Sequence, residues 1–295
     1  MTTVSEPLSV RHSPQVASWL PVLVLPAVVF LVGMGWPAWI FLWSLSSGIY
    51  VGLKWLTYAD CSVVSPSNSR TLAYLLFWPG MDAKSFFDQR RMTAKPESVE
   101  WLYVATKLTL GVTLIALSKY ILLSHPLVAG WIGMAGILFV LHFGIFHLLS
   151  TFWRASGIHA VPLMNGPIMA SSLSDFWGRR WNLAFRDLAH IYVFRPLAGS
   201  LGVAGATMAV FAVSGIIHDL VISTAAGAGY GLPTLYFVIQ GLGLLVERSH
   251  TGKRLGLGRA VVGRVYCAVM VLAPVGLLFH RPFVEQVVLP MLRAL

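Results

Sequence analysis

Long apolar runs follow one another along almost the whole of this 295-residue chain, and they limit what it can fold into. A transmembrane helix needs about 20 mostly apolar residues to cross the hydrocarbon layer of a bilayer. Seven runs approach that length: 16–32, 36–53, 100–123, 130–152, 199–223, 233–247 and 263–280. We therefore expect an all-α, polytopic membrane protein, with a bundle of seven or eight transmembrane helices in a single membrane-embedded domain over residues 1–295.

Two further apolar stretches, Tyr74–Pro79 and Pro282–Leu295, are too short to cross a bilayer. We expect them to be re-entrant or interfacial segments packed against the bundle, and either could raise the span count to eight. The composition agrees with a lipid environment, because 57% hydrophobic and 11% charged residues leave too little polar surface for a water-soluble globule. The cysteines Cys61 and Cys267 lie far apart, so neither a disulfide framework nor a zinc site is indicated.

Lysine and arginine are concentrated in alternate loops of this chain, which carries a formal net charge of +10. The predicted loops 54–99, 154–198 and 248–262 are basic, whereas the alternate connections 33–35, 124–129 and 224–232 carry no Lys or Arg. Because positive residues favour the cytoplasmic side, we expect the amino terminus and the basic loops in the cytoplasm and the carboxyl terminus outside. The charge then reflects anionic lipid headgroups, and an anionic substrate, rather than nucleic acid.

The most polar and aromatic segment between two predicted spans is Ser171-Ser-Leu-Ser-Asp-Phe-Trp-Gly-Arg-Arg-Trp-Asn182. On a helical wheel, Asp175, Arg179 and Asn182 share one face. Trp177 and Trp181 share another. Such a helix suits the membrane boundary, where tryptophans act as anchors. The pattern alone leaves open whether this is only an interfacial helix or a functional segment.

A histidine and a carboxylate lie inside the predicted span at Phe211-Ala-Val-Ser-Gly-Ile-Ile-His-Asp219. Ionisable groups in a membrane are costly, and they usually face a cavity or a partner. His218 can exchange a proton near neutral pH, so it can act as a base toward an alcohol that attacks a thioester. Ser214 and Gly215 leave room there for a substrate or a neighbouring helix. The alternative is a structural histidine that is hydrogen-bonded to another span.

These two segments together resemble the membrane-bound O-acyltransferase superfamily, and specifically its wax synthase-like branch. The resemblance rests on Ser172-Leu-Ser-Asp-Phe-Trp-Gly-Arg-Arg-Trp-Asn182 and on Val213-Ser-Gly-Ile-Ile-His-Asp219. Tyr74-Leu-Leu-Phe-Trp-Pro-Gly-Met-Asp82 and Phe237-Val-Ile-Gln-Gly-Leu-Gly-Leu-Leu-Val-Glu247 support it, so the likeness covers about residues 74–295.

The resemblance implies a bundle around a catalytic tunnel, in which an acyl group passes from acyl-CoA to the hydroxyl of a lipid alcohol. His218 takes the family's catalytic histidine position as general base, and Asn182 orients substrate or stabilises charge on the thioester carbonyl. Asp219 stands where glutamate is common, so its role in orienting His218 is open. From charge and position we expect Arg179 and Arg180 to meet the phosphates of CoA. The segment's Asp175, Trp177 and Trp181 are further candidate substrate contacts, and Ser214 and Asp219 are supporting residues.

No metal or other cofactor is expected, and acyl-CoA is the co-substrate. His142 and His147 share a predicted span but point about 140° apart on a helix, so one metal cannot easily bind both. A haem between His142 and His218 is a further alternative. The same residues could also transfer a short acyl group to a glycan or isoprenoid-type acceptor. Two alternatives are not enzymes. One is a proton-coupled transporter in which His218 and Asp219 form a proton relay, and the other is a non-catalytic scaffold.

Overall fold

The computed structural model describes residues 16–61, 66–91 and 93–295, and within these ranges every regular element is helical. The α-helices are α1 Val16–Gly33, α2 Ala38–Ala59, α3 Asn68–Phe77, α4 Ala83–Phe87, α5 Ser98–Ile121, α6 Pro126–Leu138, α7 Phe146–Ala155, α8 Leu173–Asp175, α9 Leu183–Ala189, α10 Arg195–Ala226, α11 Leu232–Arg248, α12 His250–Arg254, α13 Ala260–Leu272, α14 Val275–Leu278, α15 Arg281–Phe283 and α16 Leu289–Ala294. π-helical turns occupy Phe139–Ile145, Phe176–Arg180, His190–Phe194 and Val284–Val288, and a 3-10 turn covers Pro167–Met169. The predicted all-α class is confirmed.

Each of the seven predicted spans is helical in the structure. Among the residues that the structure describes, five helical stretches are long and apolar enough to cross a membrane: Val16–Gly33, Ser98–Ile121, Pro126–Ala155, Leu183–Ala226 and Ala260–Leu278. The other two predicted spans correspond to α2 and α11. The chain is therefore a polytopic integral membrane protein.

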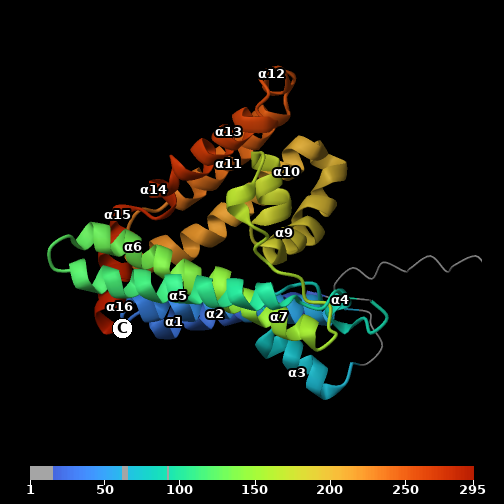
Figure 1. Cartoon of the computed structure of the whole chain (residues 1–295), viewed down its shortest axis with the longest axis horizontal. Helices are drawn as coiled ribbons and strands as arrows, with labels where there is room; N and C mark the ends of the chain where they lie inside the picture. The colour runs from blue at the N-terminus through green and yellow to red at the C-terminus, as the bar shows by residue number, and fades with distance from the viewer. Residues whose placement is uncertain (1–15, 62–65, 92) are drawn as a thin grey trace, which may run out of the picture.

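Figure 1 shows two groups of helices, with α1, α2, α5 and α6 in one and α10, α11 and α13 in the other. Small residues let neighbouring helices approach closely, as is common where lipid supplies no hydrophobic driving force between helices. A Cβ on Gly52 of α2 would lie 2.7 Å from the carbonyl oxygen of Pro21 in α1. Gly111 of α5 and Gly136 of α6 face each other, and a Cβ on either would lie 2.9 Å from the other's carbonyl oxygen.

The two short apolar stretches pack against the bundle, as expected. The carboxyl-terminal segment returns beside α6, where Gly130 and Gly133 receive the side chains of Val284 and Leu292. Tyr74–Pro79 falls on α3 and the residues that follow it. Tyr74 is fully buried, and its hydroxyl lies 2.8 Å from the Thr57 hydroxyl of α2.

Lys54 corrects the predicted extent of the first basic loop. The residue lies inside α2 rather than in a loop, and only 1% of it is exposed. Its ammonium donates a hydrogen bond to the Gly80 carbonyl and lies 3.3 Å from the centre of the Tyr74 ring. Lys54 therefore joins α2 to the segment after α3, because a buried ammonium needs an acceptor and a π face supplies part of its lost hydration.

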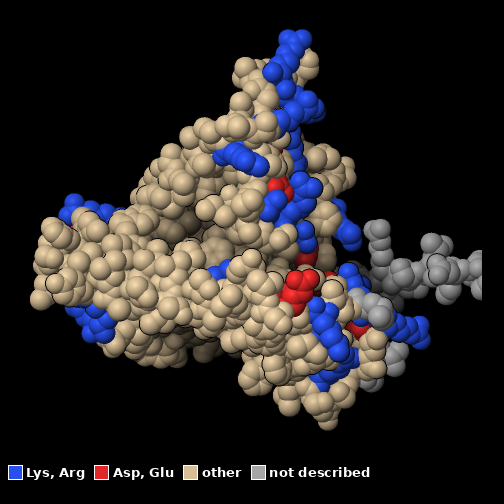
Figure 2. All heavy atoms as spheres, in the orientation of Figure 1, with Lys and Arg blue, Asp and Glu red and all other residues tan. Residues whose placement is uncertain are grey.

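Figure 2 shows Lys and Arg gathered over α12 and around α3 and α4. These are parts of the first and third predicted basic loops. The amino terminus, residues 1–15, lies outside the described residues, and the orientation of the chain in the membrane stays a prediction.

Candidate active site

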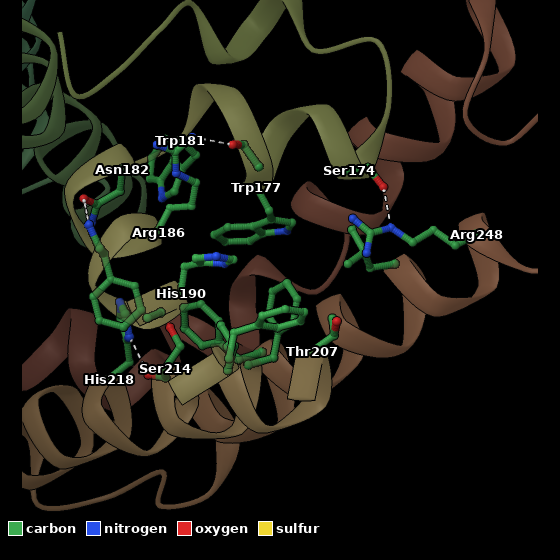
Figure 3. Close-up of a pocket in the computed structure, with 18 residues that line it drawn as sticks. Ser174, Trp177, Trp181, Asn182, Arg186, His190, Thr207, Ser214, His218 and Arg248 are labelled. Carbon is green, nitrogen blue, oxygen red and sulfur yellow. Dashed lines mark hydrogen bonds between the residues drawn. The ribbon is translucent and has the colours of Figure 1, made fainter. Parts of the chain in front are cut away.

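A cavity of about 320 Å³ opens among the elements that carry the two singled-out segments. Figure 3 shows its lining side chains, which come from the segment 174–194 and from α10 and α11. They are Ser174, Trp177, Gly178, Trp181, Asn182, Phe185, Arg186, Ala189, His190, Phe194, Thr207, Val210, Phe211, Ser214, His218, Phe237, Leu244 and Arg248. The fold thus brings His218 and Asn182, which are separate in sequence, to one cavity.

His218 faces this cavity from α10 and is held in one tautomer. Its Nδ1 lies 2.7 Å from the backbone oxygen of Ser214, one turn earlier. Because a carbonyl oxygen only accepts, Nδ1 must carry the proton, and Nε2 of the neutral ring is left as an acceptor. No described residue hydrogen-bonds to Nε2. The imidazole is therefore oriented with a free basic nitrogen, and the Phe237 ring, 4.4 Å away between centroids, packs beside it.

The sequence suggested that Ser214 and Gly215 leave room for a substrate or for a neighbouring helix, and in the structure each residue serves one of these purposes. Ser214 lines the cavity, and its carbonyl orients His218. Gly215 serves the neighbouring helix instead, because a Cβ there would lie 2.8 Å from the Thr234 Cα of α11.

Asp219 does not contact the imidazole of its neighbour in sequence. Its Oδ2 accepts hydrogen bonds from the Gly231 backbone N–H at 2.7 Å and the Thr234 hydroxyl at 2.9 Å. Successive residues on a helix point about 100° apart, so a side chain adjacent to His218 cannot share its face. Asp219 therefore ties α10 to the start of α11, and the backbone of Ser214 orients His218.

Asn182 stands at a break in the backbone between the π-turn Phe176–Arg180 and α9. Its φ of 41° is left-handed, a conformation that asparagine tolerates better than most residues. The side-chain oxygen accepts from the Phe185 N–H at 3.2 Å and so caps α9. The amide nitrogen of Asn182 has no acceptor among the described residues, which leaves two N–H donors available at the cavity wall.

Trp177 and Trp181 were expected either as anchors of an interfacial helix or as substrate contacts. Both line the cavity. Trp177 donates its indole N–H to the fully buried Gln240 at 3.3 Å, and Trp181 stacks on Phe176. The π-turn, closed by the Trp181 N–H bond to the Phe176 carbonyl, shifts the helical phase that a regular wheel assumes.

Asp175 pairs with both arginines of the motif. Its carboxylate accepts from Arg179 Nε at 2.9 Å and from Arg180 Nε at 2.6 Å. Burial raises the pKa of Asp175, but the Arg180 hydrogen bond, the Ser171 N–H and the two positive charges outweigh it and hold the pKa below its usual range. The i, i+4 pairing of Asp175 with Arg179 agrees with the helical wheel. None of these three residues lines the cavity.

Five polar cavity residues were not singled out as site residues in the sequence: Ser174, Arg186, His190, Thr207 and Arg248. Arg248 is exposed at the end of α11, and its Nε donates to the Ser174 hydroxyl at 3.1 Å. Among the described residues that line the cavity, none is a carboxylate, so its fixed charge is positive. The sequence indicated only that Arg248 belongs to a basic loop. The close approach of α11 to α8 places it at the cavity.

Comparison with known proteins points to the same segments. A family model described as the membrane bound O-acyl transferase family matches residues 160–239, which include both Asn182 and His218. The long-chain-alcohol O-fatty-acyltransferase of Simmondsia chinensis is 36% identical over 101 residues, which are 31% of this chain and 28% of that protein. Probable long-chain-alcohol O-fatty-acyltransferase 9 of Arabidopsis thaliana is 31% identical over 146 residues, 45% of this chain and 42% of that protein. Acyl-CoA–sterol O-acyltransferase 1 of the same plant is 38% identical over 73 residues, 22% and 21% of the two chains.

The similarity thus covers less than half the length of each of these relatives. The family-model match, residues 160–239, includes the two main segments that carried the resemblance seen in the sequence. The family-model match and the relatives named as long-chain-alcohol O-fatty-acyltransferases agree with the resemblance to the wax synthase-like branch of the membrane-bound O-acyltransferases.

Proposed function

We propose that the chain is an acyl-CoA-dependent O-acyltransferase whose acceptor is the hydroxyl of a lipid alcohol. The free Nε2 of His218 and the free amide nitrogen of Asn182 at one cavity carry this proposal. An unprotonated imidazole nitrogen is a base for a hydroxyl, and an amide N–H is a donor for a developing oxyanion. Relatives that are named as fatty-acyltransferases of long-chain alcohols support the choice of donor and acceptor.

The reaction follows from these two groups. His218 Nε2 takes the proton of the alcohol while the alcohol oxygen attacks the thioester carbon. The carbonyl oxygen becomes an oxyanion that Asn182 stabilises with its N–H groups. The carbon–sulfur bond then breaks, and the proton on Nε2 passes to the departing thiolate, which gives an ester and free CoA. Ser214 keeps the imidazole in the required tautomer throughout.

The remaining cavity wall suits apolar chains and excludes water. Phenylalanines from four elements, Phe185, Phe194, Phe211 and Phe237, line it together with Val210 and Leu244. Water would otherwise hydrolyse the thioester, and its exclusion strengthens the hydrogen bonds to the oxyanion. An aliphatic acyl or alkyl chain gains free energy by leaving water for such a wall.

Arg248 is better placed than Arg179 or Arg180 to meet the phosphates of CoA. Arg179 and Arg180 are paired with Asp175 outside the cavity. Arg248 has no carboxylate partner among the described residues, and Figure 3 shows it with Ser174 and Thr207 well away from His218. Thr207 and His218 lie 11 residues apart on α10, about 16 Å.

Ester formation by the purified protein tests the function. Detergent-solubilised chain is given radiolabelled palmitoyl-CoA and a panel of alcohols, and labelled ester is measured for wild type, His218→Ala and His125→Ala. His125 is an exposed residue at the α5–α6 turn and controls for the loss of any histidine. We expect wild type and His125→Ala to form ester and His218→Ala to lose about 10²- to 10⁴-fold in kcat, the usual value of general base catalysis.

Equal ester formation by a folded His218→Ala variant would show that His218 is not the base. If wild type forms no ester with any alcohol, short acyl donors with glycan acceptors are the next substrates. Flux of a substrate across proteoliposomes without a covalent product would instead favour a transporter.

A further inference from the structure

Glu247 makes a contact that joins α11 to the segment bearing Asn182. It lies near the end of α11 and is 5% exposed. Its two carboxylate oxygens accept the backbone N–H groups of Leu173 at 2.6 Å and Ser174 at 3.1 Å, the first two residues of α8. Helix N-termini leave backbone N–H groups without partners and carry partial positive charge, so a carboxylate is well suited to this place.

The charge of Glu247 has no side-chain counter-ion within ion-pair distance among the described residues. Its neighbour Arg248 donates to the Ser174 hydroxyl instead. The α8 backbone amides are thus the groups that compensate this buried carboxylate. A buried carboxylate is costly unless it is hydrogen-bonded, and here the backbone N–H groups of α8 supply those bonds. The contact between Glu247 and α8 therefore fixes α11 against the start of α8.

The face of α11 that carries Glu247 also contacts both functional segments. Gln240 lies two turns earlier, accepts the Trp177 indole N–H at 3.3 Å and donates to the Met270 carbonyl at 2.6 Å. Phe237 packs against the His218 ring. α11 therefore holds the start of α8, the Trp177 ring and the catalytic imidazole from one helix.

We propose that Glu247 is a positioning residue of the acyl-transfer reaction. By holding the first turn of α8, it fixes the helical segment Leu173–Arg180 and so places Asn182 relative to His218. The inference rests on the proposed function, because it assigns Glu247 a role in that reaction. Glu247 itself does not line the cavity.

Replacement by glutamine separates this role from the side chain's volume. Glu247→Gln keeps the shape but replaces one acceptor oxygen by an NH₂ group, which cannot accept an N–H. Glu247→Asp keeps both acceptor oxygens on a shorter arm. Glu285→Gln is the matched control, because Glu285 is an exposed residue paired with Arg281 away from the cavity.

Steady-state kinetics with palmitoyl-CoA and a saturating alcohol give the first readout. For Glu247→Gln we expect kcat to fall at least tenfold and the KM for palmitoyl-CoA to change less than threefold. Glu247→Asp should recover at least a third of the lost kcat, and Glu285→Gln should match wild type. A purely structural role predicts a loss of active protein, without a change in kcat per folded molecule and without rescue by aspartate.

A labelling experiment gives a second readout that does not depend on activity. Gly178 lies in the same segment, and a Cβ there meets no atom within 4 Å, so a Gly178→Cys side chain has open space beside the cavity and reports the segment's position. In a background of Cys61→Ser and Cys267→Ala, we expect Glu247→Gln to change the rate of maleimide modification at position 178 at least threefold. Glu285→Gln should leave the rate unchanged.

The outcomes separate the two proposals. If wild type forms no ester, the proposed function fails, and the positioning role of Glu247 in that reaction fails with it. If wild type forms ester but Glu247→Gln leaves kcat within twofold, or leaves the labelling rate unchanged, the inference is overturned and the proposed function stands.

Discussion

Asn182 and His218 each use one side-chain atom for a structural contact and leave the other at the cavity, so their substitution can separate stability from chemistry. Asn182 uses its side-chain oxygen to cap α9 and leaves its nitrogen at the cavity. His218 uses Nδ1 for the Ser214 carbonyl and leaves Nε2. In both cases one atom holds the residue in place, and the other is available to a substrate.

Asn182→Asp should therefore lose activity without losing stability. Aspartate keeps the capping oxygen and tolerates the left-handed backbone, but it has no N–H donors. We expect kcat to fall about 10²- to 10³-fold, the usual cost of removing one oxyanion donor. The apparent Tm in detergent, followed by fluorescence, should stay close to that of wild type.

Asn182→Ala is the comparison for that prediction. It removes the cap as well as the donor and places alanine at φ 41°. Loss of the cap alone lowers the free energy of unfolding by about 1–2 kcal/mol, so the Tm should fall as well as kcat. An Asn182→Asp protein with full activity would exclude the amide as a donor to the reaction.

At the scale of the element, the π-turn Phe176–Arg180 and the packing of α11 decide how the site is assembled. The sequence indicated the motif and its polarity, and the Asp175 pair with Arg179 follows a regular wheel. The sequence could not place the side chains of Trp177 and Trp181, because the π-turn departs from α-helical phase. The Trp177 indole also donates to Gln240, which lies 63 residues away in sequence. Pairing over such a distance depends on the approach of two helices.

Close helix packing in the first group of helices gives a prediction about stability. Gly111→Ala puts a Cβ 2.7 Å from the Val140 backbone nitrogen and 2.9 Å from the Gly136 carbonyl, so α5 must move away from α6. Overpacking of this kind costs about 1–3 kcal/mol, and we expect a lower apparent Tm.

Gly199→Ala in α10 serves as the control for that substitution, because a Cβ there meets nothing within 4 Å. Its Tm should equal or exceed that of wild type, since alanine favours a helix over glycine. Equal Tm values for Gly111→Ala and Gly199→Ala would contradict close packing of α5 on α6.

At the scale of the whole molecule, the distribution of charge predicts the orientation in the membrane. Lys and Arg gather over α12, whereas the α10–α11 turn at 227–231 carries none. Cysteines introduced at Lys253 and at Tyr230, in a background without Cys61 and Cys267, should therefore lie on opposite sides. An impermeant maleimide added outside intact cells should label Tyr230→Cys and spare Lys253→Cys.

Permeabilised cells provide the control, because both cysteines should then react. Labelling of Lys253→Cys in intact cells, with Tyr230→Cys protected, would reverse the orientation. That result would also put Arg248, which precedes α12, on the outer side, where a cytoplasmic acyl-CoA could not reach it.

The sequence alone determined that lipid is the solvent, that the chain is helical and which few polar residues are costly inside it. Those properties follow from run length and composition, which need no knowledge of partners. Tertiary structure decided where each polar side chain lies. Asp219 accepts a hydrogen bond from the residue before α11, Arg180 pairs with the carboxylate of Asp175, and Arg248 lines the cavity. The reason is that side-chain direction depends on helix phase, which a π-turn changes, and on contacts between segments that are distant in sequence, such as the one from Glu247 to α8.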